Sequence, residues 1–213
     1  MPRAPLILFA ALCVAGAVPA AAQEWDGAAV GVSVNHDWIR SDSQFTSILA
    51  LPIGPVPAGR YTDQDVSLGA VAGYRWQSGA LVLGAEADAA ISLGGSTAGP
   101  GPFYAVDPKW HGSLRAVAGV SLDRVLVYAT AGAATGTFAF RHDPGVPLTR
   151  LTHSESPTGL VLGGGIEFAA GRIHPRLEYR HVRYQQTTTE VSSINYRDRV
   201  SSDSLRLNLL YRF

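Results

Sequence analysis

The chain has 213 residues with 17 basic and 17 acidic side chains, so its formal net charge is zero, and only 16% of its residues are charged. This balance argues against nucleic acid as a partner, because the chain has no excess of positive charge to attract phosphates. Lys109 is the only lysine, whereas soluble proteins use many charged side chains to keep their surface hydrated. We therefore expect much of the outer surface to face something other than water.

The first 22 residues have the composition of a secretory signal peptide. A basic residue precedes a long apolar run, and Ala20 and Ala22 form a small-residue cleavage pattern. We expect cleavage after Ala22, which leaves residues 23–213 as a single mature domain. Cys13, the only cysteine, lies in the apolar run, so the mature chain is expected to contain no disulfide.

Downstream of the signal peptide, apolar and polar side chains alternate in runs of roughly a dozen residues, separated by segments rich in Gly, Pro, Ser and Asp. This alternation predicts strands with one apolar face. In chain order, the eight expected strands are residues 25–38, 65–76, 80–92, 109–122, 125–138, 159–168, 173–184 and 204–213. In the strand 125–138, small residues lie on both faces, so the sequence does not assign which face points outward.

The expected connections alternate in length. Three are tight turns, at residues 77–79, 123–124 and 170–172, and four are long, at roughly 39–63, 93–108, 139–157 and 187–199. Alternating short and long connections are typical of an eight-stranded, antiparallel, up-and-down transmembrane β-barrel with short periplasmic turns and long extracellular loops. Closure is required because a bilayer offers no partner to the backbone groups of an open sheet edge.

A soluble barrel or sandwich would also alternate, so the two alternatives differ in what each face contains. A soluble barrel should carry many charges outside. Here one face is nearly uniform Leu, Val and Ala, with Tyr or Trp toward strand ends, as at the aromatic girdles of membrane barrels. We therefore expect an integral protein of the Gram-negative outer membrane.

The opposite face carries charges that an eight-stranded barrel would bury, because its interior is just wide enough for side chains to fill it. We expect paired acidic and basic side chains there, with Glu86 beside Arg115 and Glu178 beside Arg206, because unpaired charges would be costly. Such a belt either plugs the barrel or lines a gated path. Its expected members are Arg75, Glu86, Asp88, Arg115, Glu167, Arg176, Glu178, Arg180 and Arg206.

The last ten residues, "SLRLNLLYRF", form the eighth expected strand. Their apolar stripe from Leu205 to Phe213 is predicted to face lipid, with Arg206 in the interior belt and Arg212 near the periplasmic rim. Leu210 falls on the inward face and does not fit this pattern.

Several segments resemble a known family: "WDGAAVGVSV", "GYRWQSGALVLGAEAD", "GSLRAVAGVSLDRVLVYATAG", "GGGIEFAAGRIHPRLEYRHV" and the terminal "LYRF". They are similar to the small outer-membrane β-barrels of opacity-type, porin-like surface antigens of alphaproteobacteria, over essentially residues 25–213. Ala28 and Ala29 depart from the family, which often has an aromatic residue there. The resemblance implies no enzymatic activity, and it implies that Tyr211 and Phe213 form the terminal signal for the barrel insertion machinery.

No catalytic, cofactor-binding or metal-binding residue is expected. The six histidines show no zinc-type spacing, although His142 and His153 share one expected loop and some relatives in the resembled family are described as haem-binding. The segment "QQTTTEVSS" contains hydroxyl groups, but no base and orienting group accompany them.

Two functions remain open, and an enzyme is the third alternative. The first is a monomeric, non-enzymatic barrel that supports outer-membrane integrity and displays its loops, with membrane lipid, lipopolysaccharide and host or phage molecules as partners. The second is a small porin-like channel for ions or small solutes. An outer-membrane enzyme would need a Ser, His and acid set on the lipid face or near the rim, and the sequence suggests none.

Overall fold

The computed structural model describes residues 24–48, 51–94, 104–142, 151–191 and 194–213, so the expected signal peptide lies outside the described residues. No helix in these ranges is both long enough and apolar enough to cross a membrane. The described strands are β1 (Gly27–Ile48), β2 (Leu51–Ser78), β3 (Leu81–Ser92), β4 (Tyr104–Leu122), β5 (Val125–His142), β6 (Leu151–Glu155), β7 (Thr158–Phe168), β8 (Ile173–Tyr184), β9 (Thr187–Val191) and β10 (Ile194–Arg212).

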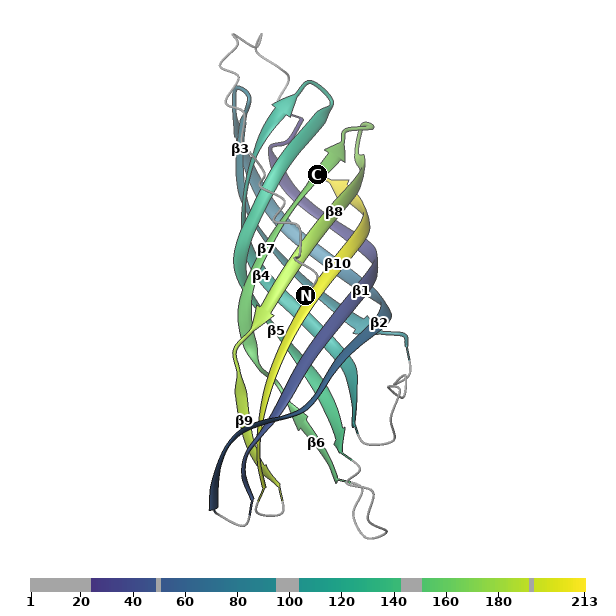
Figure 1. Ribbon diagram of the computed structural model, residues 1–213. Coiled ribbons are helices and arrows are strands. Elements are labelled where there is room, and N and C mark those ends of the chain that lie inside the picture. The colour runs from purple at the N-terminus through teal and green to yellow at the C-terminus, as the bar shows by residue number, and fades with distance from the viewer. Residues whose placement is uncertain (1–23, 49–50, 95–103, 143–150, 192–193) are drawn as a thin grey trace.

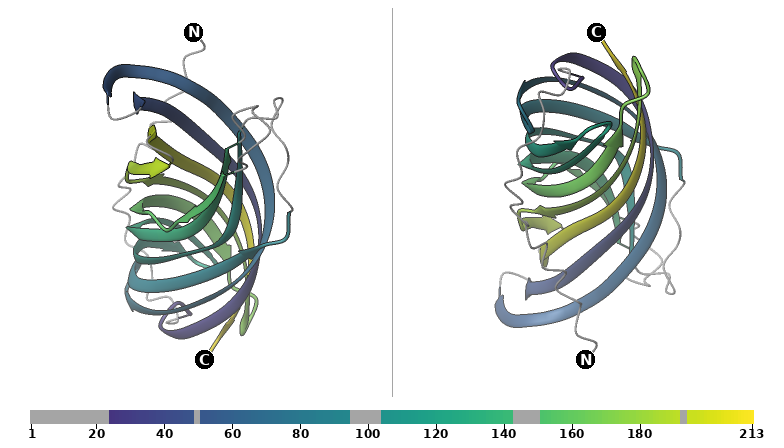
Figure 2. Two further views of the ribbon diagram at one scale, coloured as in Figure 1. Left: turned by 90° about the horizontal axis from the view of Figure 1, so that it is seen from below. Right: turned by 90° about the horizontal axis from the view of Figure 1, so that it is seen from above.

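The strands form one closed antiparallel barrel, as predicted (Figure 1). Apart from the short strands β6 and β9, each strand pairs with the next one along the chain, and β1 pairs with β10 to close the ring. The short β6 and β7 both pair with β5, and β8 and β9 both pair with β10, so each couple acts as one barrel strand. The barrel therefore has eight strands around its circumference, which curve about a common axis in the end-on views of Figure 2.

A proline marks one of the two interruptions. Pro157 lies between β6 and β7 and has no backbone N–H to donate to a ladder, so pairing is broken there. The other interruption, at residues 185–186, separates β8 from β9.

The three expected tight turns join β2 to β3, β4 to β5 and β7 to β8 at one end of the molecule, which we call the turn end. Gly79 and Gly171 adopt positive φ values of 60° and 66°, a conformation that glycine adopts without steric cost. Asp123 also has a positive φ, and a short acidic side chain tolerates this conformation better than a bulky one.

At the opposite end, which we call the extended end, the strands run further than the sequence predicted. The expected long connection at 39–63 is mostly paired strand, since β1 continues to Ile48 and its partner β2 begins at Leu51. Similarly, β9 and the start of β10 occupy much of 187–199. These segments lack an apolar stripe. Outside a membrane, however, two strands can pair through their backbones without an apolar face.

The alternation of faces follows the predicted pattern. On β10, Leu207 is 63% exposed on the outside, whereas the neighbouring Arg206 is 1% exposed in the interior. The face left open on the fifth expected strand is now assigned, because Leu126 and Tyr128 point inward and Val127 points outward. Leucine, valine and isoleucine side chains thus cover the outside, and the polar side chains fill the inside.

Leu210 is buried in the interior although it breaks the polar pattern. Its partner across the β1–β10 ladder is Gly31. A Cβ atom at Gly31 would lie only 2.8 Å from the Leu210 side chain. The missing side chain at Gly31 therefore provides the space that Leu210 fills.

Candidate functional site

The interior of the barrel contains the candidate functional site. All nine residues predicted for the charge belt lie there, each with an exposed fraction of 7% or less. They come from β2, β3, β4, β7, β8 and β10. Strand alternation explains their common direction, since every second residue of these strands points inward.

One bridge in the belt joins Arg176 on β8 to Glu86 on β3, which lie on opposite sides of the barrel. Arg176 donates from Nη1 to Oε2 at 2.9 Å and from Nη2 to Oε1 at 2.7 Å, a bidentate geometry. Arg75 also donates to Glu86 Oε1 at 2.6 Å, and Arg176 Nε donates to Glu167 at 2.8 Å. Paired charges therefore span the full width of the interior at this level.

Asp88 is the centre of a second group in the belt. Its Oδ1 accepts from Arg180 Nη1 at 3.0 Å and from Arg206 Nη1 at 3.1 Å. Arg115 Nη2 lies 3.2 Å from its Oδ2, which also accepts from the Ser113 hydroxyl. Three guanidinium groups from three strands thus converge on one carboxylate.

The expected pairs between neighbouring strands are present but long. Arg115 lies 3.6 Å from Glu86, and Arg206 lies 3.9 Å from Glu178. Shorter contacts cross the interior, such as Arg115 Nη1 to Glu178 Oε1 at 2.5 Å. A long arginine side chain reaches past its neighbouring strand, so the pairing depends on the shape of the whole barrel.

Tyr128 also belongs to the belt, although the sequence pattern did not predict it. Its hydroxyl donates to Glu178 Oε2 at 2.7 Å. The guanidinium groups of Arg75 and Arg176 lie 5.5 Å and 5.3 Å from the centre of its ring, within the range of cation–π attraction. The signal for it was weak, because small residues on both faces of its strand obscured the inward parity.

Trp25 closes the interior at the turn end. It is fully buried, and its indole Nε1 donates to Ser121 at 2.8 Å. Its backbone N–H donates to Gln77 at 3.0 Å, and its carbonyl accepts from Arg212 at 2.9 Å. It packs in an apolar group that we call the turn-end cap: Trp25, Val82, Val117, Leu126, Tyr128 and Ala169.

The extended end of the interior is also filled. Beyond the belt, Asp37 accepts hydrogen bonds from the hydroxyls of Ser67 and Ser204. An apolar group follows inside the barrel, further toward the extended end, and we call this interior group the outer layer. Its members are Ile39, Ala134, Phe138, Val161, Val182, Tyr184 and Val200.

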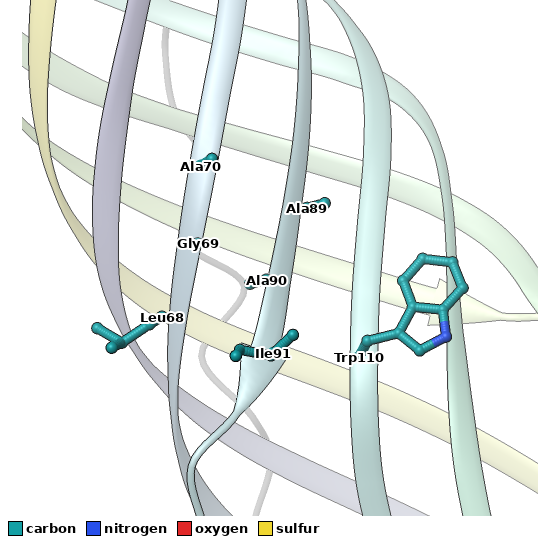
Figure 3. A pocket seen from close by; sticks show the side chains of 7 residues that line it. All are labelled: Leu68, Gly69, Ala70, Ala89, Ala90, Ile91 and Trp110. Atoms are coloured by element: carbon teal, nitrogen blue, oxygen red, sulfur yellow. The ribbon is translucent and has the colours of Figure 1, made fainter.

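A surface hollow lies on the outside of the barrel, over β2, β3 and β4 (Figure 3). Leu68, Ile91 and Trp110 form its walls, and small residues such as Ala70 and Ala89 form its floor. No charged or nucleophilic side chain lines it, so it offers no group for catalysis.

Within the described residues, no three His, Cys, Asp or Glu side chains are grouped so that they could hold a metal ion. The backbones of His142 and His153 lie in β5 and β6, but their side chains are outside the described residues.

Comparison with known proteins agrees with this architecture. Residues 7–213 match the family model of the outer membrane protein β-barrel domain. The chain is 32% identical over 146 residues to a 22 kDa outer membrane protein of Rhizobium leguminosarum bv. viciae, covering 66% of this chain and 63% of that relative. It is 25% identical to the 25 kDa outer-membrane immunogenic protein of Brucella canis, covering 89% of this chain and 79% of the relative.

Two solved structures of outer membrane proteins are similar to this chain to different degrees. The outer membrane protease OmpT of Escherichia coli has a TM-score of 0.52 at 8% identity, covering 89% of this chain and 97% of that one. The Ail protein of Yersinia pestis has a TM-score of 0.43 at 15% identity, covering 85% and 99%. Because the family model spans nearly the whole chain and the strands close into a barrel with an apolar outer face, this chain belongs to the outer membrane protein β-barrel family and resides in the cell outer membrane.

Proposed function

We propose that this protein is a closed, non-enzymatic outer-membrane barrel that contributes to membrane integrity and displays its extended end at the cell surface. The observation that carries this proposal is the filling of the interior at three successive levels: the turn-end cap, the charge belt and the outer layer. A side-chain bridge that spans the barrel, such as Arg176 to Glu86, leaves no straight path for solutes at its level.

The surface role is supported by the strands that continue beyond the part of the barrel whose outside is covered by apolar side chains. The β1–β2 hairpin, β6 and β9 project from the extended end (Figure 1). Loops and strand ends held on a rigid scaffold are the usual sites of molecular recognition. We propose that this end faces the exterior and contacts host, phage or neighbouring molecules, while Tyr211 and Phe213 address the chain to the insertion machinery.

Planar-bilayer recording of the purified, refolded protein tests closure. We expect no ohmic conductance steps from the native chain, since the paired belt excludes a continuous water path. Removal of the bridge by Glu86→Ala with Arg176→Ala should introduce conductance and serves as the matched comparison. Regular steps from the native chain would contradict the proposal and favour the alternative, a small channel for ions or solutes.

A further inference from the structure

An acidic residue lies on the outward face of the barrel, at the end of the apolar stripe of β10. Asp203 of β10 shares this face with Leu205 and Leu207, yet its side chain is only 11% exposed. Three side chains surround it. Its Oδ1 accepts from the Tyr179 hydroxyl at 2.5 Å and lies 2.9 Å from His181 Nδ1, and its Oδ2 accepts from Arg40 Nη1 at 2.5 Å.

The height of this cluster follows from the strand geometry. Asp203 lies ten residues before Phe213, and ten residues of a tilted strand rise about 26 Å along the barrel axis. The apolar band of outer-membrane barrels is about 25 Å tall. Asp203 and its partners therefore stand where the apolar band ends and the lipid head groups of the outer leaflet begin.

The cluster contains one carboxylate and several basic side chains. Arg40 and His181 share the single carboxylate of Asp203, and their side chains remain 56% and 43% exposed. One step further out, Ser201 pairs with Arg40 on one side and with Arg183 on the other, which places both arginines on the same row. Within the described ranges, the side chain of Arg183 is exposed and forms no hydrogen bond or ion pair.

Two other exposed cations near the extended end differ from this arrangement. Arg60 pairs with Asp42 at 2.6 Å, and Lys109 pairs with Asp107 at 2.6 Å. Each has a carboxylate of its own, so its charge is neutralised locally. The two provide matched controls for the cluster on β1, β8 and β10.

We propose that Arg40, His181 and Arg183 form a binding site for a phosphate group of a phosphorylated lipid in the outer leaflet. Asp203 orients Arg40 and His181 from beneath, and the guanidinium groups of Arg40 and Arg183 give charge-assisted hydrogen bonds to phosphate oxygens. The acyl chains lie below, along the exposed Leu205, Leu207 and Leu209. The half-exposed ring of Tyr179 stands at the boundary, as aromatic side chains do at membrane interfaces. This site goes beyond the proposed function and does not depend on whether the barrel conducts.

Native mass spectrometry of the full chain in maltoside micelles tests the site. The probes are diphosphorylated lipid A, the same lipid with its phosphates removed, and inorganic phosphate. We expect the native chain to prefer the phosphorylated lipid about tenfold or more, and the double variant Arg40→Gln with Arg183→Gln to lose this preference. The control variant Arg60→Gln with Lys109→Gln should keep it.

Folding of each variant is checked by the heat-dependent shift of its band in electrophoresis. If the double variant fails to fold, Arg183→Gln alone replaces it, because that side chain has no partner among the described residues. Equal binding of the two lipids by the native chain, or an unchanged preference in the folded variant, would overturn the proposal. Displacement of the lipid by inorganic phosphate at equal concentration would assign the site to the free ion instead.

Discussion

At the scale of single residues, the interior charges depend on one another more than on their sequence neighbours. Glu86 accepts hydrogen bonds from Arg75 and Arg176, and Asp88 accepts them from Arg180 and Arg206. Each carboxylate thus serves guanidinium groups from more than one strand. The loss of one acid therefore removes one anion from several buried cations at once.

Glu86→Ala is expected to lower the free energy of unfolding by about 3–5 kcal/mol, since it leaves Arg75 and Arg176 buried and incompletely paired. Urea titration of the micelle-refolded protein, followed by the electrophoretic band shift, measures the change. The matched control is Asp42→Ala, which breaks the exposed pair with Arg60 and should cost less than about 1 kcal/mol. Equal losses from the two variants would contradict a dominant role for burial.

At the scale of strands, the paired region of the β1–β2 hairpin exceeds what the interior requires. Ile39 is the last residue of β1 that belongs to the outer layer, whereas the strand continues to Ile48. The remaining segment makes cross-strand pairs with β2, and with β10 on its other side. This segment therefore extends the paired strands beyond the level of the outer layer.

Replacement of residues 43–59 by Asn-Gly is expected to leave a folded barrel. Asp42 and Arg60 are cross-strand partners, so a two-residue turn of this type can join them without a change of register. Retention of the heat-dependent band shift in the shortened chain, with the native chain run in parallel, checks the prediction. A chain that no longer folds would mean that the barrel depends on the projecting hairpin.

At the scale of the whole molecule, the sequence was sufficient to predict the barrel architecture but not the side-chain contacts across its interior. Alternation along each strand predicted the outward side chains, because a period of two is a property of the strand alone. The partner of Arg176 could not be predicted this way, because Glu86 faces it across the barrel from 90 residues earlier in the chain. Trp25 was also missed as a cap, since its burial depends on Gln77, Ser121 and Arg212, which meet only when the ring is closed.

The burial of Trp25 also gives the molecule an optical reporter of its interior. Trp76 and Trp110 are 59% and 41% exposed on the outer face, where brominated lipid tails would quench their fluorescence by contact, whereas Trp25 is shielded by the barrel wall. A chain in which Trp25 is the only remaining tryptophan should emit at short wavelength and resist this quencher in vesicles. Loss of that emission would then report the opening of the turn end directly in a membrane. The native indole group serves as the probe, so no fluorescent label has to be attached.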